Sequence, residues 1–171
     1  MRNIHVLIAG EGGQGIQTIA EILARAAFLE GKHSTYIPNF GVEQRGGVSI
    51  AFAQISDKEI VFPKFSKADI MIILCHRAIK RVEKYFGEKT LYIYDSTLLE
   101  HKGIGIKATT LAKGLNPKVF NVIILGFLST KLPIKKESII GGMEEVLGEK
   151  FKKNPEIKKL NLKALELGSK L

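Results

Sequence analysis

The sequence predicts an α/β fold in which an open, mostly parallel sheet carries one β-hairpin and is followed by C-terminal helices. Continuous apolar runs at 3–9 and 69–74 are typical of parallel strands that are covered on both faces. Segments with helical spacing alternate with such runs, as in α/β proteins. No repeat or low-complexity linker interrupts the pattern, so residues 1–171 are predicted to form one domain.

The first half of the chain supplies the hairpin. The run at 3–9 leads through a glycine-rich break into a helix at 16–30, which Gly31 ends. A strand at 34–37, or up to 40, and a loop at 41–47 follow. Two further strands, 48–55 and 59–62, are predicted to form the hairpin because Ser56, Asp57 and Lys58 between them favour a turn, and Pro63 ends the second strand.

The second half is predicted to hold strands at 69–74, 91–94 and 106–109, with a helix at 77–86. The segment 118–130 has the composition of a helix that is apolar on nearly all sides, which must be covered by the domain core or by a partner. Two amphipathic helices, 135–147 and 156–167, complete the chain. Asn154 and Pro155 provide an N-cap and a first-turn proline for the last of them.

The charge is concentrated in the last third of the chain. The net charge is +9, and residues 101–171 hold fourteen basic and six acidic side chains, a net of +8. This face could meet an acidic protein, a phosphate-bearing ligand or nucleic acid, but a solvated lysine-rich surface is the simpler interpretation. Because no nucleic-acid-binding motif or aromatic interleaving accompanies the charge, no nucleic-acid partner is expected.

The cysteine content excludes several classes of site. Cys75 is the only cysteine, so this chain alone cannot form a disulfide framework, a Cys₄ iron–sulfur cluster or a cysteine-based zinc site. The four histidines show no metal-ligand spacing. The sequence has neither a secretory signal nor an apolar run of the roughly 20 residues that a membrane span needs. We therefore expect no metal site, no membrane contact and a cytoplasmic location.

The break after the first strand matches the phosphate-binding pattern G-x-G-x-x-G between a strand and a helix. Glycines allow close backbone approach to a phosphate, and the following helix N-terminus offers free N–H groups and a positive dipole end. The predicted binding residues are Gly10, Gly12, Gly13, Gln14 and Gly15. The alternative is a tight turn without a ligand.

A Rossmann-like dinucleotide site also needs an acidic residue at the end of the second strand, to hold the ribose. Here that strand ends near Pro38, Asn39 and Phe40, without an acid. An independent Rossmann-like nucleotide-binding protein or reductase stays as the alternative class. No side chains stand out as an acid–base pair, so no catalytic residue is predicted.

A second glycine-rich loop, 41–47, places Arg45 between flexible residues. In a parallel sheet it would lie beside the first loop at the carboxyl ends of the strands, where ligands bind. Arg45 could there pair with a phosphate or carboxylate, so it joins the predicted site. Glu11 would oppose an anion unless it points away or pairs with Arg45.

Six segments follow one another in an order, and at a chain length, typical of one family: 10–15 (GEGGQG), 40–49 (FGVEQRGGVS), 55–63 (ISDKEIVFP), 68–69 (AD), 121–126 (NVIILG) and 160–168 (LNLKALELG). Together they resemble the gamma subunit of the 2-oxoacid:ferredoxin oxidoreductases over nearly the whole chain. Val42 stands where the family often has proline. Gln44 and Arg45 also resemble the indolepyruvate branch, whereas the Arg45-Gly46-Gly47 ending fits the 2-oxoglutarate and general 2-oxoacid enzymes better.

The resemblance implies a CoA-dependent oxidative decarboxylation of a 2-oxoacid, with 2-oxoglutarate favoured, to acyl-CoA, CO₂ and reduced ferredoxin. It implies partner subunits of alpha, beta and delta type that carry thiamine diphosphate, Mg²⁺ and the iron–sulfur clusters, with ferredoxin as the electron acceptor. This chain would complete the assembly without an active site of its own, and its glycine loop could contact coenzyme A.

Overall fold

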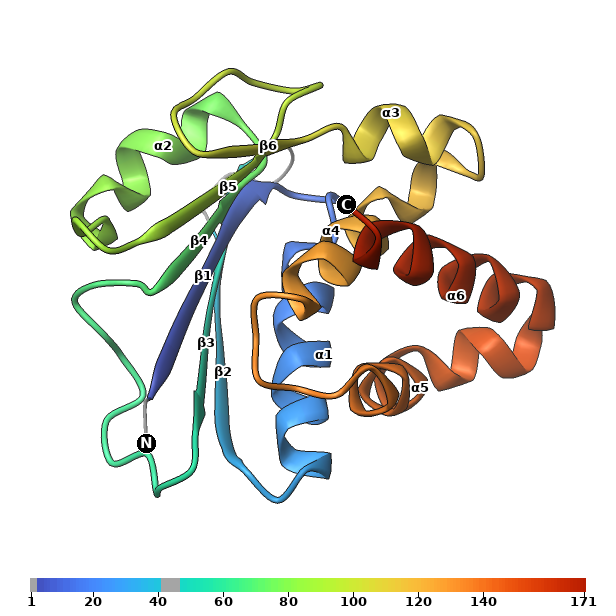
Figure 1. Cartoon of the computed structure of the whole chain (residues 1–171), viewed down its shortest axis with the longest axis horizontal. Coiled ribbons are helices and arrows are strands. Elements are labelled where there is room, and N and C mark those ends of the chain that lie inside the picture. Colours follow the sequence, from blue (N-terminus) through green and yellow to red (C-terminus); the bar gives the residue numbers. More distant parts are fainter. Residues whose placement is uncertain (1–2, 41–46) are drawn as a thin grey trace.

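A six-stranded mixed sheet forms the centre of the molecule, and helices cover both of its faces (Figure 1). The computed structural model describes residues 3–40 and 47–171. In order of pairing, the strands are β2 (His33–Phe40), β3 (Val48–Ser56), β1 (Ile4–Glu11), β4 (Ile70–Ile73), β5 (Leu91–Asp95) and β6 (Ile104–Ile106). The pairs β1–β4, β4–β5 and β5–β6 are parallel, whereas β3 runs antiparallel to both β1 and β2. The predicted fold class is confirmed.

The helices fall into two unequal groups. They are α1 (Ile16–Leu29), α2 (His76–Val82), α3 (Ala108–Lys113), α4 (Phe120–Ser129), α5 (Lys136–Lys153) and α6 (Pro155–Ser169), with 3₁₀ turns η1 (Glu83–Tyr85) and η2 (Pro117–Val119). Figure 1 shows α2 on one face of the sheet and α1 and α4 on the other. Outside these, α5 packs on α1 and α6 packs on α4. One face is therefore covered by two helical layers and the other by a thin layer.

The hairpin lies elsewhere than the sequence predicted. β2 and β3 form it, with His33 opposite Ser56 and Phe40 opposite Ser49. Residues 59–62, predicted as its second strand, form no strand. Their β-branched and aromatic residues do suit a strand, but composition cannot distinguish a side chain that packs in a sheet from one that faces solvent. Val61 and Phe62 face solvent, with exposed fractions of 89% and 71%.

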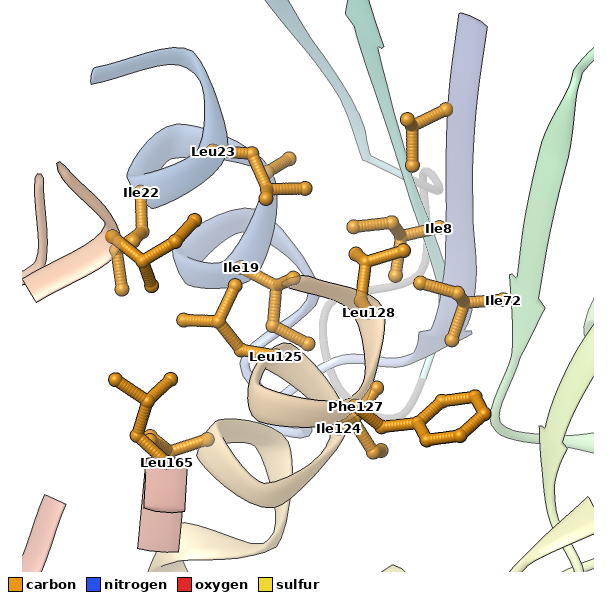
Figure 2. Close-up of a cluster of buried hydrophobic side chains, with 14 of the residues drawn as sticks. Ile8, Ile19, Ile22, Leu23, Ile72, Ile124, Leu125, Phe127, Leu128 and Leu165 are labelled. Atoms are coloured by element: carbon orange, nitrogen blue, oxygen red, sulfur yellow. The ribbon is translucent and has the colours of Figure 1, made fainter. Parts of the chain in front are cut away.

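Helix α4 is the centre of the larger core, as its all-round apolar sequence required. Every residue from Val122 to Leu128 is buried. Figure 2 shows Phe127 and Leu128 directed towards Ile8 of β1 and Ile72 of β4, and Leu165 of α6 on the far side of the helix. The domain itself therefore covers this helix, and no partner subunit is needed to bury it.

Two of the family-like segments meet where α4 and α6 cross. A Cβ added to Gly126 would collide with the carbonyl oxygen of Leu165, and one added to Gly168 would collide with that of Ile123. Glycine at both positions thus allows the two backbones to approach closely. The predicted N-cap of α6 is confirmed, because the Asn154 side chain accepts a hydrogen bond from the Glu156 N–H at 3.1 Å.

The remaining differences concern boundaries. The helix predicted at 77–86 is α2 followed by the η1 turn, and the strand predicted at 106–109 is β6 at 104–106, with α3 taking up the residues after it. Helix α5 extends to residue 153, beyond the predicted 147. Within the described part of the chain, no helix combines the length and apolar character needed to cross a membrane.

Candidate functional site

The first glycine loop joins the carboxyl end of β1 to the N-terminus of α1, and the Gln14 side chain closes it. Gln14 Oε1 accepts a hydrogen bond from the Glu11 N–H at 2.7 Å, and Gln14 Nε2 donates to the Leu74 carbonyl at 3.2 Å. Both ends of the amide are therefore used within the protein. Gln14 was predicted as a binding residue, but the structure places its side chain where it supports the loop.

The four glycines of this loop have different reasons to be glycine. A Cβ on Gly10 would collide with Gln14 and Ile16, and one on Gly15 would collide with Asn121. Gly13 and Gly15 have positive φ angles of 94° and 76°, a region that glycine adopts without strain. Gly12 has an ordinary φ, and the nearest atom to its added Cβ is the Gly47 oxygen at 3.7 Å. Contacts and φ angles among the described residues thus favour glycine at the other three positions, whereas none of these contacts requires it at Gly12.

The N-terminus of α1 presents free backbone donors. No side chain of the described residues caps it, and its first turn contains no acidic residue. The Ile19 N–H makes the first intrahelical bond, to the Gly15 carbonyl at 3.1 Å, so the amides that precede it in the helix have no intrahelical acceptor. Gly12 and Gly13 are exposed beside them. This arrangement of N–H groups and helix dipole is suited to an anion.

The second loop ends against the first. The Gly12 N–H donates to the Gly47 carbonyl at 3.0 Å, and β1 pairs with β3 so that Glu11 lies opposite Val48. The sequence predicted that the loops would meet, but through neighbouring parallel strands; instead β3 lies between β1 and β2. Arg45 lies outside the described residues, so its part in the site stays a prediction.

Glu11 does not stand as an unpaired charge. Its Oε1 accepts a hydrogen bond from Arg77 Nη2 at 2.8 Å. Arg77 comes from the start of α2, which follows β4, the parallel neighbour of β1. Both side chains are partly exposed, so the pair contributes little to stability. It does offset the negative charge at the mouth of the loop, by means of an arginine that the sequence did not single out.

Asn121 is a second residue of the site that sequence reasoning missed. It lies in the first turn of α4, and its amide nitrogen occupies the space that a Cβ on Gly15 would need. Its buried Oδ1 has no hydrogen-bond partner within the described part of the chain. The 121–126 segment contributed to the family resemblance, but 106 positions separate Asn121 from Gly15, and no local pattern reports that contact.

The described residues contain no metal-ligand cluster, and their cysteine is buried. No cluster of three or more His, Cys, Asp or Glu side chains among them could hold a metal ion. Cys75 is 8% exposed, and burial raises the pKa of its thiol above the ordinary value, which disfavours the thiolate that a metal ligand or nucleophile needs. Between residues 33 and 39, β2 offers no acid for a ribose, and β3 separates it from β1.

The comparison with protein families now decides the assignment. The model of the family described as "Pyruvate ferredoxin/flavodoxin oxidoreductase" matches residues 5–171. The chain belongs to this family. Within it, the chain is a gamma subunit of a 2-oxoacid:ferredoxin oxidoreductase, since gamma-type relatives match over almost the whole length of both chains. The resemblance found in the sequence is thereby confirmed.

Some relatives are subunits of about the length of this chain, and others are longer chains of which it matches about a third. "2-oxoglutarate synthase subunit KorC" of Archaeoglobus fulgidus is 32% identical, over 98% of this chain and 87% of its own. "Pyruvate/ketoisovalerate oxidoreductases common subunit gamma" of Thermococcus litoralis is 32% identical, over 94% and 92%. "Ketoisovalerate oxidoreductase subunit VorA" of Methanothermobacter thermautotrophicus is 29% identical, over 97% of this chain but 36% of its own.

Solved structures share the fold. The keto/oxoacid ferredoxin oxidoreductase gamma subunit of Geobacter sulfurreducens has a TM-score of 0.80 at 23% identity, covering 98% of this chain and 95% of that one. The 2-oxoglutarate:ferredoxin oxidoreductase of Magnetococcus marinus, with 2-oxoglutarate, coenzyme A and succinyl-CoA bound, has a TM-score of 0.86 at 23% identity, covering 99% of this chain and 31% of that one. At this identity the likeness concerns the fold.

Proposed function

We propose that this gamma subunit contributes its first glycine loop to coenzyme A binding, in an enzyme that converts 2-oxoglutarate and coenzyme A to succinyl-CoA and CO₂ with reduction of ferredoxin. The substrate is supported by the relative named 2-oxoglutarate synthase. The observation that carries the loop assignment is Gly12, which is exposed beside the N-terminal amides of α1 and which no contact with another described residue requires to be glycine.

Coenzyme A suits this site chemically. Its phosphates are acceptors of hydrogen bonds, and the loop and the first turn of α1 offer donors. A residue without a side chain at Gly12 lets a phosphate approach the backbone, and Arg77 offsets the charge of Glu11. Arg45, on the adjoining loop, would add a charged donor. The loop therefore holds and orients the acyl acceptor rather than moving protons or electrons.

The remaining chemistry is assigned to partner subunits. We propose partners of alpha, beta and delta type, with ferredoxin as the electron acceptor and the cytoplasm as the location. On those subunits, thiamine diphosphate with Mg²⁺ would supply the chemistry of decarboxylation, and iron–sulfur clusters would supply the path for two electrons to ferredoxin.

The test exploits the room at Gly12. In the assembled enzyme, Gly12→Asp adds a negative charge at the loop, and Gly12→Asn adds nearly the same volume without the charge. Repulsion should raise the KM for coenzyme A about tenfold more in the aspartate variant than in the asparagine variant, if the charge lies within a few ångströms of a phosphate. Arg45→Ala should raise the same KM about tenfold through loss of one charged hydrogen bond.

Assembly and thermal stability serve as controls, because among the described residues only the Gly47 oxygen, at 3.7 Å, lies within 4 Å of a Cβ added to Gly12. If Gly12→Asp and Arg45→Ala both assemble and keep the wild-type KM for coenzyme A, the loop is structural and the assignment is wrong.

A further inference from the structure

The most exposed large apolar side chains of the described residues gather at the amino edge of the sheet, opposite the glycine loops. They are Val61 at 89%, Phe62 at 71% and Phe28 at 67% exposure. Val61 and Phe62 belong to the segment that links β3 to β4, and Phe28 lies in the last turn of α1. Phe28 and Ile60 line the same hollow, which places the two segments side by side. We call residues 60–62 the apolar ridge.

The backbone of the ridge is anchored at Phe62, and the chain just beyond it is packed. Gln54, only 1% exposed, donates through Nε2 to the Phe62 carbonyl at 3.0 Å and accepts through Oε1 from Asn3 Nδ2 at 3.1 Å. Phe65, just beyond the ridge, is 9% exposed and stacks on His5 with ring centroids 4.7 Å apart. The apolar side chains are therefore presented to solvent from an anchored segment rather than left on a loose loop.

Hollows lie on both sides of the ridge. One of about 470 Å³ separates Ile60 from Phe28 and the start of β2. Another of about 580 Å³ runs between Phe62, Lys64 and His5. Apolar side chains between two hollows form a surface that can be complementary in shape to the surface of another protein. Exposed contiguous apolar surface of this kind marks a site of interaction with another protein.

The rim of this surface is basic. Lys58, Lys64 and Lys67 are exposed around the ridge. Of the three acids in the same segment, Asp57 is paired with Lys32 at 3.0 Å and Asp69 accepts a hydrogen bond from the His5 N–H at 2.9 Å. The third acid, Glu59, lies among these three lysines. The charge therefore favours a partner whose apolar contact is bordered by carboxylates.

We propose that the apolar ridge and its lysine rim are the docking surface for another subunit of the oxidoreductase, one that offers an apolar recess bordered by Asp or Glu. The domain occurs in nearly its full length as a separate subunit and also as about a third of longer chains. In both arrangements it belongs to a larger enzyme, so a surface for sibling parts is expected. The inference rests on the gamma-subunit assignment and is independent of the coenzyme A site.

The first experiment removes the ridge. Co-express the chain with the other subunits of its native enzyme and compare wild type with Val61→Ser/Phe62→Ser. The double variant should raise the dissociation constant of this chain from the complex about tenfold or more, because a few buried apolar side chains supply most of the binding energy of such interfaces. The control Leu171→Ser changes a side chain that is 52% exposed at the other end of the chain, and it should assemble normally.

The second experiment tests the lysine rim by comparing two double variants that change the net charge by the same amount. Lys58→Glu/Lys64→Glu should slow assembly at low salt, whereas Lys153→Glu/Lys163→Glu, on the exposed surfaces of α5 and α6, should leave it unchanged. Ridge variants assembled at high concentration should keep the wild-type KM for coenzyme A, which separates this proposal from the previous one.

Two results would overturn the proposal. One is a Val61→Ser/Phe62→Ser complex as stable as wild type, with the isolated variant folded. The other is an isolated wild-type chain that dimerises, in analytical ultracentrifugation, through a contact that the same double change abolishes, because the ridge would then bind a second copy.

Discussion

The two ends of the sheet present opposite kinds of surface. The carboxyl edge exposes main chain at Gly12 and Gly13 and at the N-terminus of α1, which no described side chain caps. Beside them lies the Glu11 carboxylate, whose charge Arg77 offsets. The amino edge exposes large apolar side chains on a held segment, with lysines around them. Backbone donors suit a small anion, and an apolar relief suits another protein. The proposals therefore assign ligand binding to one edge of the sheet and contact with another subunit to the opposite edge.

The topology accounts for the separation. Parallel β1 and β4 end at the same edge, and each is followed by a helix whose N-terminus lies there. The positive ends of those helix dipoles therefore gather at the carboxyl edge. The link from β3 to β4 begins and ends at the amino edge, because β3 runs antiparallel to β1 and β4 runs parallel to it. The ridge has to lie there.

The largest expected effect contrasts two valines. Val122 is 3% exposed inside α4, and Val61 is 89% exposed in the ridge. Val122→Asp should lower the free energy of unfolding by about 4 kcal/mol, because an unpaired charge would be buried. Val61→Asp should change it by less than about 0.5 kcal/mol while weakening assembly. Urea denaturation of both variants measures this, and equal losses would contradict the contrast.

A smaller effect contrasts two glycines of the first loop. Gly15→Ala should cost about 2–3 kcal/mol, from its left-handed φ of 76° and from the collision with Asn121. Gly12→Ala should change the free energy of unfolding by no more than about 0.5 kcal/mol, because no described atom lies closer than 3.7 Å to the added Cβ. Thermal unfolding of the isolated chain distinguishes them. A large loss in Gly12→Ala would mean that the fold, and not a ligand, keeps this position glycine.

Sequence reasoning succeeded where a pattern is local. The apolar run of β1, the glycine loop and the helix that follows it form one continuous segment, and its elements were predicted. Helix α4 was predicted to be covered because its residues are apolar on all sides. The Asn154 cap of α6 depends only on its next two residues.

The failures concern contacts between distant segments. Residues 59–62 have the composition of a strand, and only the bond from the buried Gln54 to Phe62, together with their exposure, shows that they form a ridge. The hairpin of β2 and β3 has residues 41–47 between its strands, which is longer than the two- to five-residue turns that a sequence pattern can predict. The pairing of Glu11 with Arg77 spans 66 positions, and nothing in the local sequence of either residue reports it. The spacing of apolar residues along the sequence does not predict a residue that acts through contacts with distant segments.

The central claim is that coenzyme A binds at the carboxyl edge of the sheet and a partner subunit at the amino edge. Amide hydrogen exchange on the assembled enzyme tests it most directly. Assembly alone should protect peptides that cover 57–67, relative to the isolated chain. Addition of coenzyme A to the complex should then protect peptides that cover 12–18, without further change at 57–67. Unchanged exchange at 57–67 on assembly, or at 12–18 on addition of coenzyme A, would contradict the account.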